Sequence, residues 1–176
     1  MSELTEVTNL DPDPNALKGR YNWGASIVRS ADGRHWSYIG KGNSYMGSCT
    51  QSVAAAAPVG HVIVLIAQTV DTAFAPAKIS AADGLLNEQA GDTYIKAARI
   101  TATGLHDVPI SKCTTGVTIL GSALYTPDDW EQVLSLYQRG ALQYPWFAGD
   151  LYPRESVGGL SLLAVYPHHL ELGVVA

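Results

Sequence analysis

The sequence predicts an all-β domain of the sandwich type with one short helix, and three observations support this prediction. Seventeen Gly and nine Pro residues divide the 176-residue chain into short segments, which is typical of strands joined by tight turns. The run 60–70 is apolar on both faces, as expected of a central strand that is covered on two sides. Residues 25–30 and 35–40 flank an Asp32-Gly33 pair, a strong signal for a β-hairpin.

The composition excludes several classes of function. Only 15% of the residues are Asp, Glu, Lys or Arg, against roughly 25% in an average soluble domain. The formal net charge of −5 disfavours nucleic-acid binding, because phosphate contacts need clustered Lys and Arg. The N-terminus has no secretory signal, and the uninterrupted apolar run 62–67 is far shorter than the ~20 residues that a bilayer requires. We therefore expect no membrane insertion, and a surface suited to neutral ligands or to neighbouring subunits.

We expect residues 1–22 to form an extended N-terminal arm and residues 23–176 to form a single sandwich domain. In the arm, Pro12 and Pro14 each push the preceding residue into an extended conformation. Together with Leu10, these prolines are the candidate residues for docking on a neighbouring subunit. In the body, further strands are predicted around Ile79 and over residues 93–103, 117–124, 160–166 and 170–175.

One helix is predicted over residues 127–139. Thr126 is a suitable N-cap, and Pro127 occupies the first helical position, where its missing N–H costs nothing. Gly140 is expected to end the helix. We expect the apolar side of this helix to pack across an edge or an open end of the sandwich. That side is formed at helical spacing by Trp130, Val133, Leu134 and Tyr137.

Signatures of catalysis are mostly missing, so we expect a non-enzymatic protein without metal or cofactor. The segment 40–44 (GKGNS) is better explained as a glycine-rich turn than as a phosphate loop, because no amphipathic helix follows it. A Ser–His–Asp set that meets only in space stays open. Cys49 and Cys113 are expected to be two buried thiols, and a disulfide between them across the sandwich stays open as the alternative. The five histidines lack metal-ligand spacing: His35, His61, His106, His168 and His169.

Aromatic residues gather in one short stretch and suggest a binding surface. Trp36 and Tyr38 share a face of their predicted strand, because side chains alternate along a strand. Exposed rings of this kind stack on sugars, so Trp23, Trp36, Tyr38 and Tyr45 are the candidate glycan-binding residues. The alternative, that these rings fill the core or contact another subunit, also stays open.

A second aromatic cluster spans residues 144–153 (YPWFAGDLYP), with prolines near both ends. Prolines fix the backbone in an extended conformation, and the Gly149-Asp150 pair favours a turn. We interpret this cluster as a plug that closes one end of the sandwich. A contact with a ligand or with another subunit is the alternative.

Two segments resemble the minor tail proteins of bacteriophages, notably of phages that infect actinobacteria. Residues 8–14 (TNLDPDP), followed by Trp23, resemble the opening of those proteins. Residues 144–150 (YPWFAGD) resemble their "YFDGD" signature, with Trp146 in place of Tyr and Ala148 in place of the first Asp. The resemblance implies a jelly-roll β-sandwich similar to carbohydrate-binding modules. The loss of a carboxylate at Ala148 argues against an ion-binding role for that loop.

Residues 124–137 (LYTPDDWEQVLSLY) are also similar to a segment near the end of laminin-G and concanavalin-like lectin domains, which are two-sheet jelly rolls too. Both resemblances imply a structural component of a virion, in a tail tip, a tail fibre or a capsid decoration. The expected partners are other virion subunits, including copies of the same chain, and the expected place of assembly is the host cytoplasm. The alternative function is a carbohydrate-binding module that recognises host cell-surface glycans.

Overall fold

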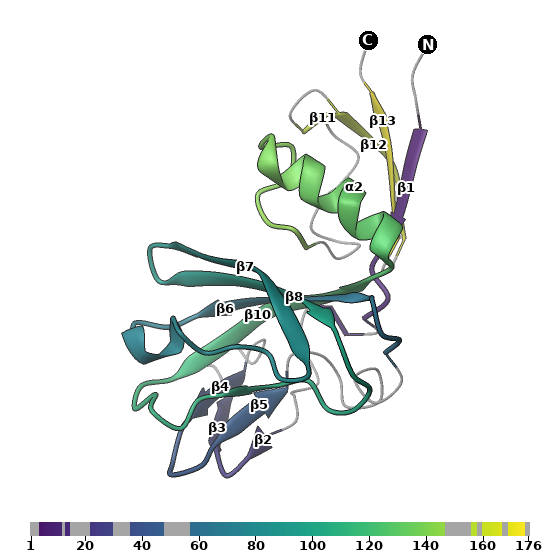
Figure 1. Cartoon of the computed structure of the whole chain (residues 1–176). Coiled ribbons are helices and arrows are strands. Elements are labelled where there is room, and N and C mark those ends of the chain that lie inside the picture. Colours follow the sequence, from purple (N-terminus) through teal and green to yellow (C-terminus); the bar gives the residue numbers. More distant parts are fainter. Residues whose placement is uncertain are drawn as a thin grey trace.

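The structure is a computed structural model, and it describes residues 4–11, 13–14, 22–29, 36–47, 57–146, 156–157, 160–166 and 169–174. The described part is mostly β, with antiparallel sheets and one α-helix, so the predicted all-β sandwich with a short helix is confirmed. The largest sheet has six strands (Figure 1). In spatial order they are β3 (Ser26–Arg29), β4 (Trp36–Ile39), β10 (Val117–Tyr125), β6 (Val62–Gln68), β8 (Thr93–Ile100) and β7 (Ala82–Ala90).

Strand β6 lies inside this sheet and divides the core in two. Its residues 62–67 are fully buried. Val62, Val64 and Ile66 belong to the core cluster on one face of the sheet. The alternate residues Ile63 and Leu65 belong to the cluster on the other face. The predicted central strand is confirmed, because its continuous apolar run is what burial on both faces requires.

A three-stranded sheet covers the second of these faces. It consists of β2 (Asn22–Trp23), β5 (Tyr45–Gly47) and β9 (Asp107–Pro109). Met46 of β5 and Val108 of β9 are fully buried and pack in the same cluster as Ile63. The predicted hairpin also forms, since β3 pairs with β4 in the antiparallel direction.

The helix α2 (Pro127–Gln138) packs on the opposite face of the six-stranded sheet. The Thr126 hydroxyl caps it by accepting from the backbone N–H of Asp129 at 3.2 Å, and Gly140 ends it with a φ of +78°. Trp130 packs beside Tyr125 of β10, with ring centroids 6.3 Å apart. The helix was expected at an edge or an open end of the sandwich. It covers a sheet face instead, because the faces of β6 and β10 offer a broad apolar surface.

Both ends of the described chain meet in a further sheet of four strands (Figure 1). Strand β1 (Leu4–Thr8) pairs with β13 (His169–Val174), so Leu4 lies opposite Gly173. The expected N-terminal arm therefore pairs with its own chain. The Thr8 N–H also donates to the Asp129 carboxylate at 3.1 Å, which links β1 to the start of α2. The remaining strands of this sheet are β12 (Leu160–Tyr166) and β11 (Ser156–Val157).

The region between β6 and β8 differs from the prediction. Ile79 was expected in a strand, but it is a buried residue of the loop between the short 3₁₀ helix η1 (Thr72–Phe74) and β7. Strand β7 was not predicted. It is an edge strand with mostly exposed residues and an irregular register between Gly84 and Leu86, so its sequence carries little alternation.

Candidate functional site

The structure separates the four candidate stacking residues into two pairs. Trp36 and Tyr38 do share a face of β4, but that face packs toward the core cluster under the three-stranded sheet. Tyr38 is fully buried, so its ring is not available to a sugar. Trp36 is half-buried, and the Arg29 guanidinium lies over its ring at 5.3 Å from the centroid. The proposal of a shared stacking face on β4 is therefore wrong for Tyr38.

Trp23 and Tyr45 form the second pair, on the outer face of the three-stranded sheet. Trp23 is 54% exposed, and its ring centroid lies 5.7 Å from that of Tyr45 at an interplanar angle of 37°. In register, Trp23 lies opposite Tyr45, and Tyr45 lies opposite Pro109. Directly opposite residues share a face, so the three side chains form one row across the sheet. We call these three residues the aromatic row.

The loop 40–44 borders the aromatic row. The Ser44 hydroxyl accepts from the Lys41 N–H at 2.5 Å, and it also lies within hydrogen-bond distance of the Lys41 and Gly24 carbonyls. Gly24 has a φ of +73°, and a Cβ there would lie 2.8 Å from the Asn43 carbonyl oxygen. The loop is thus the glycine-rich turn that was predicted. It holds the exposed polar side chains of Lys41 and Asn43 next to the row.

The described residues of the segment 9–14 form hydrogen bonds with residues 122–124 of β10, and we call this contact the arm clasp. The Asn9 carboxamide oxygen accepts from the N–H groups of Asp11 at 3.0 Å and Leu124 at 3.1 Å. Its amide nitrogen donates to the Ser122 carbonyl at 3.2 Å. The Asp11 carboxylate forms a second turn of the same kind by accepting a hydrogen bond from the Asp13 N–H at 2.9 Å. It also accepts a hydrogen bond from the Ser122 hydroxyl.

The clasp decides which arm residues face outward. Leu10 is 42% exposed, while its N–H is held by the Leu124 carbonyl at 2.8 Å. Pro14 is buried, and its carbonyl accepts from the Ser122 N–H at 2.9 Å and from the Trp146 indole N–H at 3.0 Å. Pro12 lies outside the described residues. Of the two docking candidates that the structure describes, only Leu10 is exposed.

The second motif segment packs against the clasp through Trp146. This residue is buried beside α2, and it lies so close to Gly121 of β10 that a Cβ there would be 2.3 Å from the indole. The preceding Pro145 carbonyl accepts from the Tyr125 hydroxyl at 3.2 Å. This part of the cluster fills the core beside α2, and no contact among the described residues shows it closing an end of the sandwich. Residues 147–153 lie outside the described residues.

A serine, a histidine and an aspartate do meet in space, between the loops that precede β7 and β9. The Ser80 hydroxyl lies 2.5 Å from the Asp107 carboxylate and also accepts from the Asp107 N–H. The His106 ring, however, contacts the backbone carbonyl of Ser80 at 3.1 Å. A hydrolytic triad needs the histidine between the hydroxyl and the carboxylate. These three residues instead hold two loops together.

The thiol of Cys113 is free and buried, and its burial raises its pKa to about 11. It therefore stays protonated and unreactive at neutral pH. Cys49 lies outside the described residues.

One charged residue that the sequence interpretation did not single out is buried in β8. Lys96 is 3% exposed within the segment 93–98, all of whose residues are buried. Its burial lowers its pKa to about 8. The sequence feature that could have identified this buried lysine is its position as the single charged residue in an otherwise uncharged strand sequence, TYIKAA.

Within the described ranges, no three His, Cys, Asp or Glu side chains are grouped so as to hold a metal ion. The helix of this part of the chain is too short and too polar to cross a membrane. No protein-family model, curated protein or solved structure matches this chain.

Proposed function

We propose that this chain is a non-enzymatic structural subunit of a bacteriophage particle, in a tail tip, a tail fibre or a capsid decoration. The observation that carries the proposal is the contact between the two segments that resemble phage tail proteins. They are 132 positions apart in the chain, yet the Trp146 indole N–H donates to the Pro14 carbonyl at 3.0 Å. Segments that resemble one family and also form one contact support a common structural origin.

The groups in these segments are used to hold the body together. Asn9 and Asp11 are fully buried and bonded to β10, and Trp146 fills the core over Gly121. Buried polar groups that are fully bonded stabilise a fold and are not free to act on a substrate. This arrangement favours a building block over an enzyme.

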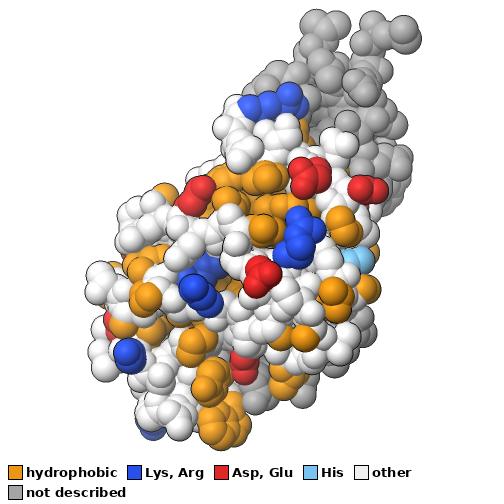
Figure 2. Space-filling model, in the orientation of Figure 1, with side chains coloured by type: hydrophobic (Ala, Val, Ile, Leu, Met, Phe, Trp, Pro, Cys, Tyr) orange, Lys and Arg blue, Asp and Glu red, His pale blue; other side chains and the backbone are white. Residues whose placement is uncertain are grey.

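The surface supports the same proposal. Figure 2 shows a small number of charged side chains of both signs among uncharged ones on the face displayed. Leu10 adds an exposed apolar side chain on the clasp, where its backbone N–H is hydrogen-bonded to the Leu124 carbonyl of β10. Low charge and a fixed apolar contact suit packing among copies of the same chain and other virion subunits.

The test is to purify particles of the phage that encodes this chain and to search them by mass spectrometry. We expect the chain among the particle proteins. We also expect Leu10→Glu to reduce the number of copies of this chain per particle, because the substitution would bury a charge at the proposed contact with a neighbouring subunit. Val70→Glu, at a residue that is 75% exposed, is the matched control. A chain found in the lysate but not in the particles would overturn the proposal, whereas normal incorporation of Leu10→Glu would overturn only the role of Leu10.

A second candidate function, the binding of host cell-surface glycans, is favoured by the aromatic row. A half-exposed Trp beside a Tyr and a Pro offers a flat apolar surface, and the neighbouring Lys41 and Asn43 supply polar groups at its border. Sugar rings match such a surface through their C–H faces.

For this function we expect Trp23→Ala to weaken binding of the best ligand from a glycan array by about 2- to 30-fold, from roughly 0.5–2 kcal/mol for one stacked ring. Calorimetry measures the affinity. Val28→Ala, at a residue that is 53% exposed and outside the row, should leave the affinity unchanged. Equal affinities for the two variants, or an array without signal, would count against glycan binding.

A further inference from the structure

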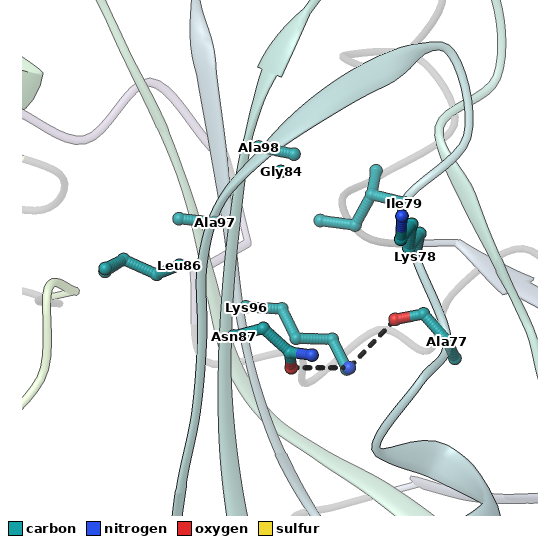
Figure 3. A pocket seen from close by; sticks show the side chains of 9 residues that line it. All are labelled: Ala77, Lys78, Ile79, Gly84, Leu86, Asn87, Lys96, Ala97 and Ala98. Atoms are coloured by element: carbon teal, nitrogen blue, oxygen red, sulfur yellow. Dashed lines mark hydrogen bonds between the residues drawn. The ribbon is translucent and has the colours of Figure 1, made fainter.

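A small cavity of about 80 Å³ lies between the loop after η1 and the β7–β8 hairpin (Figure 3). The loop contributes Ala77 and Ile79 to its wall. The hairpin contributes Gly84 and Ala98, and Figure 3 shows these two small residues side by side, facing Ile79. The side chains of Ile79 and Ala98 are apolar, and the exposed Lys78 of the same loop also lines the cavity.

The cavity exists because two paired residues of the hairpin are small. Gly84 lies directly opposite Ala98 in the register of β7 and β8. A Cβ built on Gly84 would meet no other atom within 4 Å, and the φ of this residue lies outside the left-handed region. A side chain at position 84 would therefore project into free space without backbone strain.

A buried ammonium group closes one end of the cavity. Lys96 Nζ donates to the carbonyl oxygens of Ala75 at 3.0 Å and Ala77 at 2.8 Å, and to the carboxamide oxygen of Asn87 at 2.9 Å. Asn87 is the residue directly opposite Lys96 on β7. The Phe74 ring lies beneath the amine, with its centroid 4.8 Å away.

All three acceptors of this ammonium group are neutral. In the part of the chain that the structure describes, no carboxylate forms an ion pair with Lys96. A buried charge without a counter-ion is costly, since neutral dipoles replace only part of its lost hydration. The end of the cavity at Lys96 is thus an electropositive point next to an apolar wall.

We propose that this cavity binds a small carboxylate that carries a short aliphatic group. The carboxylate accepts from Lys96 in place of the Asn87 oxygen. The exposed Asn87 side chain then turns toward solvent, and its amide nitrogen gives up its 2.9 Å hydrogen bond to the Ala75 carbonyl. The aliphatic group lies between Ile79 and Gly84, where an apolar tail is removed from water. The ligand is either a free acid or the C-terminal end of a peptide, because both present the same chemistry. This proposal is independent of the virion assignment.

The experiment is a titration of the ¹⁵N-labelled full chain at pH 7, followed by NMR. Butyrate is the probe for a free acid, and butyramide is its neutral isostere. We expect butyrate to shift the amide signals of residues 77–79, 84 and 96–98 in a saturable manner. Butyramide should bind about tenfold more weakly or worse, the loss expected for one hydrogen bond to a charged group. An acetylated dipeptide that ends in alanine, compared with its C-terminal amide, tests a peptide as the source.

Variants distinguish binding in this cavity from binding at other lysines and from nonspecific binding. Gly84→Val should fill the cavity and abolish the shifts, while Ala90→Val, at an exposed position of the same strand, should leave them unchanged. Lys96→Met should also abolish them, and Lys112→Met, at an exposed lysine, should not. Equal binding of butyrate and butyramide, or unchanged binding to a folded Gly84→Val variant, would overturn the proposal even if Lys96→Met does not fold.

Discussion

Lys96 and Cys113 are two buried groups whose pKa values are moved in opposite directions by the same cause. Burial lowers the pKa of Lys96 from 10.5 to about 8, because the ammonium form loses its hydration. Burial raises the pKa of Cys113 from 9.0 to about 11, because the thiolate is the form that loses hydration there. Between pH 8 and 9, therefore, folding makes Lys96 release protons and makes Cys113 take them up.

This difference predicts how the free energy of unfolding depends on pH. Between pH 8 and 9 the unfolded lysine keeps its proton while the folded one loses it, so the unfolded state binds more protons and stability rises with pH, by about 1 kcal/mol. As the pH approaches and passes 9, the unfolded thiol of Cys113 loses its proton while the folded one retains it, and this difference opposes the rise from Lys96. Urea unfolding at pH 7, 8 and 9 measures the effect. Lys96→Met should remove the rise and Lys112→Met should preserve it; a flat profile for the unmodified chain would contradict this account.

At the scale of elements, the arm clasp explains why the motif TNLDPDP has its sequence. Asn and Asp alternate with residues that keep the backbone extended, so Asn9 and Asp11 each bend the chain locally by accepting from the N–H two residues later. The same Asn9 side chain also bonds the backbone of β10, because it accepts from the Leu124 N–H and donates to the Ser122 carbonyl as a neighbouring strand would. The motif is thus a short segment that side-chain hydrogen bonds hold on a sheet together with backbone hydrogen bonds of Leu10 and Pro14.

We predict that Asn9→Ala lowers the free energy of unfolding by about 2–4 kcal/mol, because it leaves buried N–H and C=O groups of the clasp without their partner. Urea unfolding at pH 7 measures this loss. Asn43→Ala is the matched control, since Asn43 is exposed, and it should change stability by less than about 0.5 kcal/mol. A loss no larger than that of the control would show that the clasp contributes little to the fold.

For the whole molecule, the elements with strong local signals were predicted and those set by distant contacts were not. Strand β6 and helix α2 follow from a continuous apolar run and from capping residues at Thr126 and Gly140. Strand β7 was missed because an edge strand buries few side chains and shows no alternation. The sheet that joins β1 to β13 leaves no trace in either strand alone, since it depends on which segments meet in space.

The candidate site was also only partly predictable from the sequence, because contacts between distant segments determine it. Alternation along β4 correctly places Trp36 and Tyr38 on one face, but only the position of the three-stranded sheet determines that this face points to the core. The aromatic row requires the register between strands that are more than 60 residues apart in the chain, which places Pro109 beside Tyr45. The role of Lys96 depends on carbonyl groups of a loop, and these carry no side-chain signal.

The pairing of β1 with β13 also orders events in time. Leu4 pairs with Gly173, and residues 5–172 must be synthesised between the two partners. Hairpins such as β7–β8 join neighbouring segments and can close during translation, whereas contacts between distant segments form late. The nascent chain therefore carries β1 without its partner until β13 has been synthesised, and the emergence of β13 sets the earliest moment at which this sheet can close.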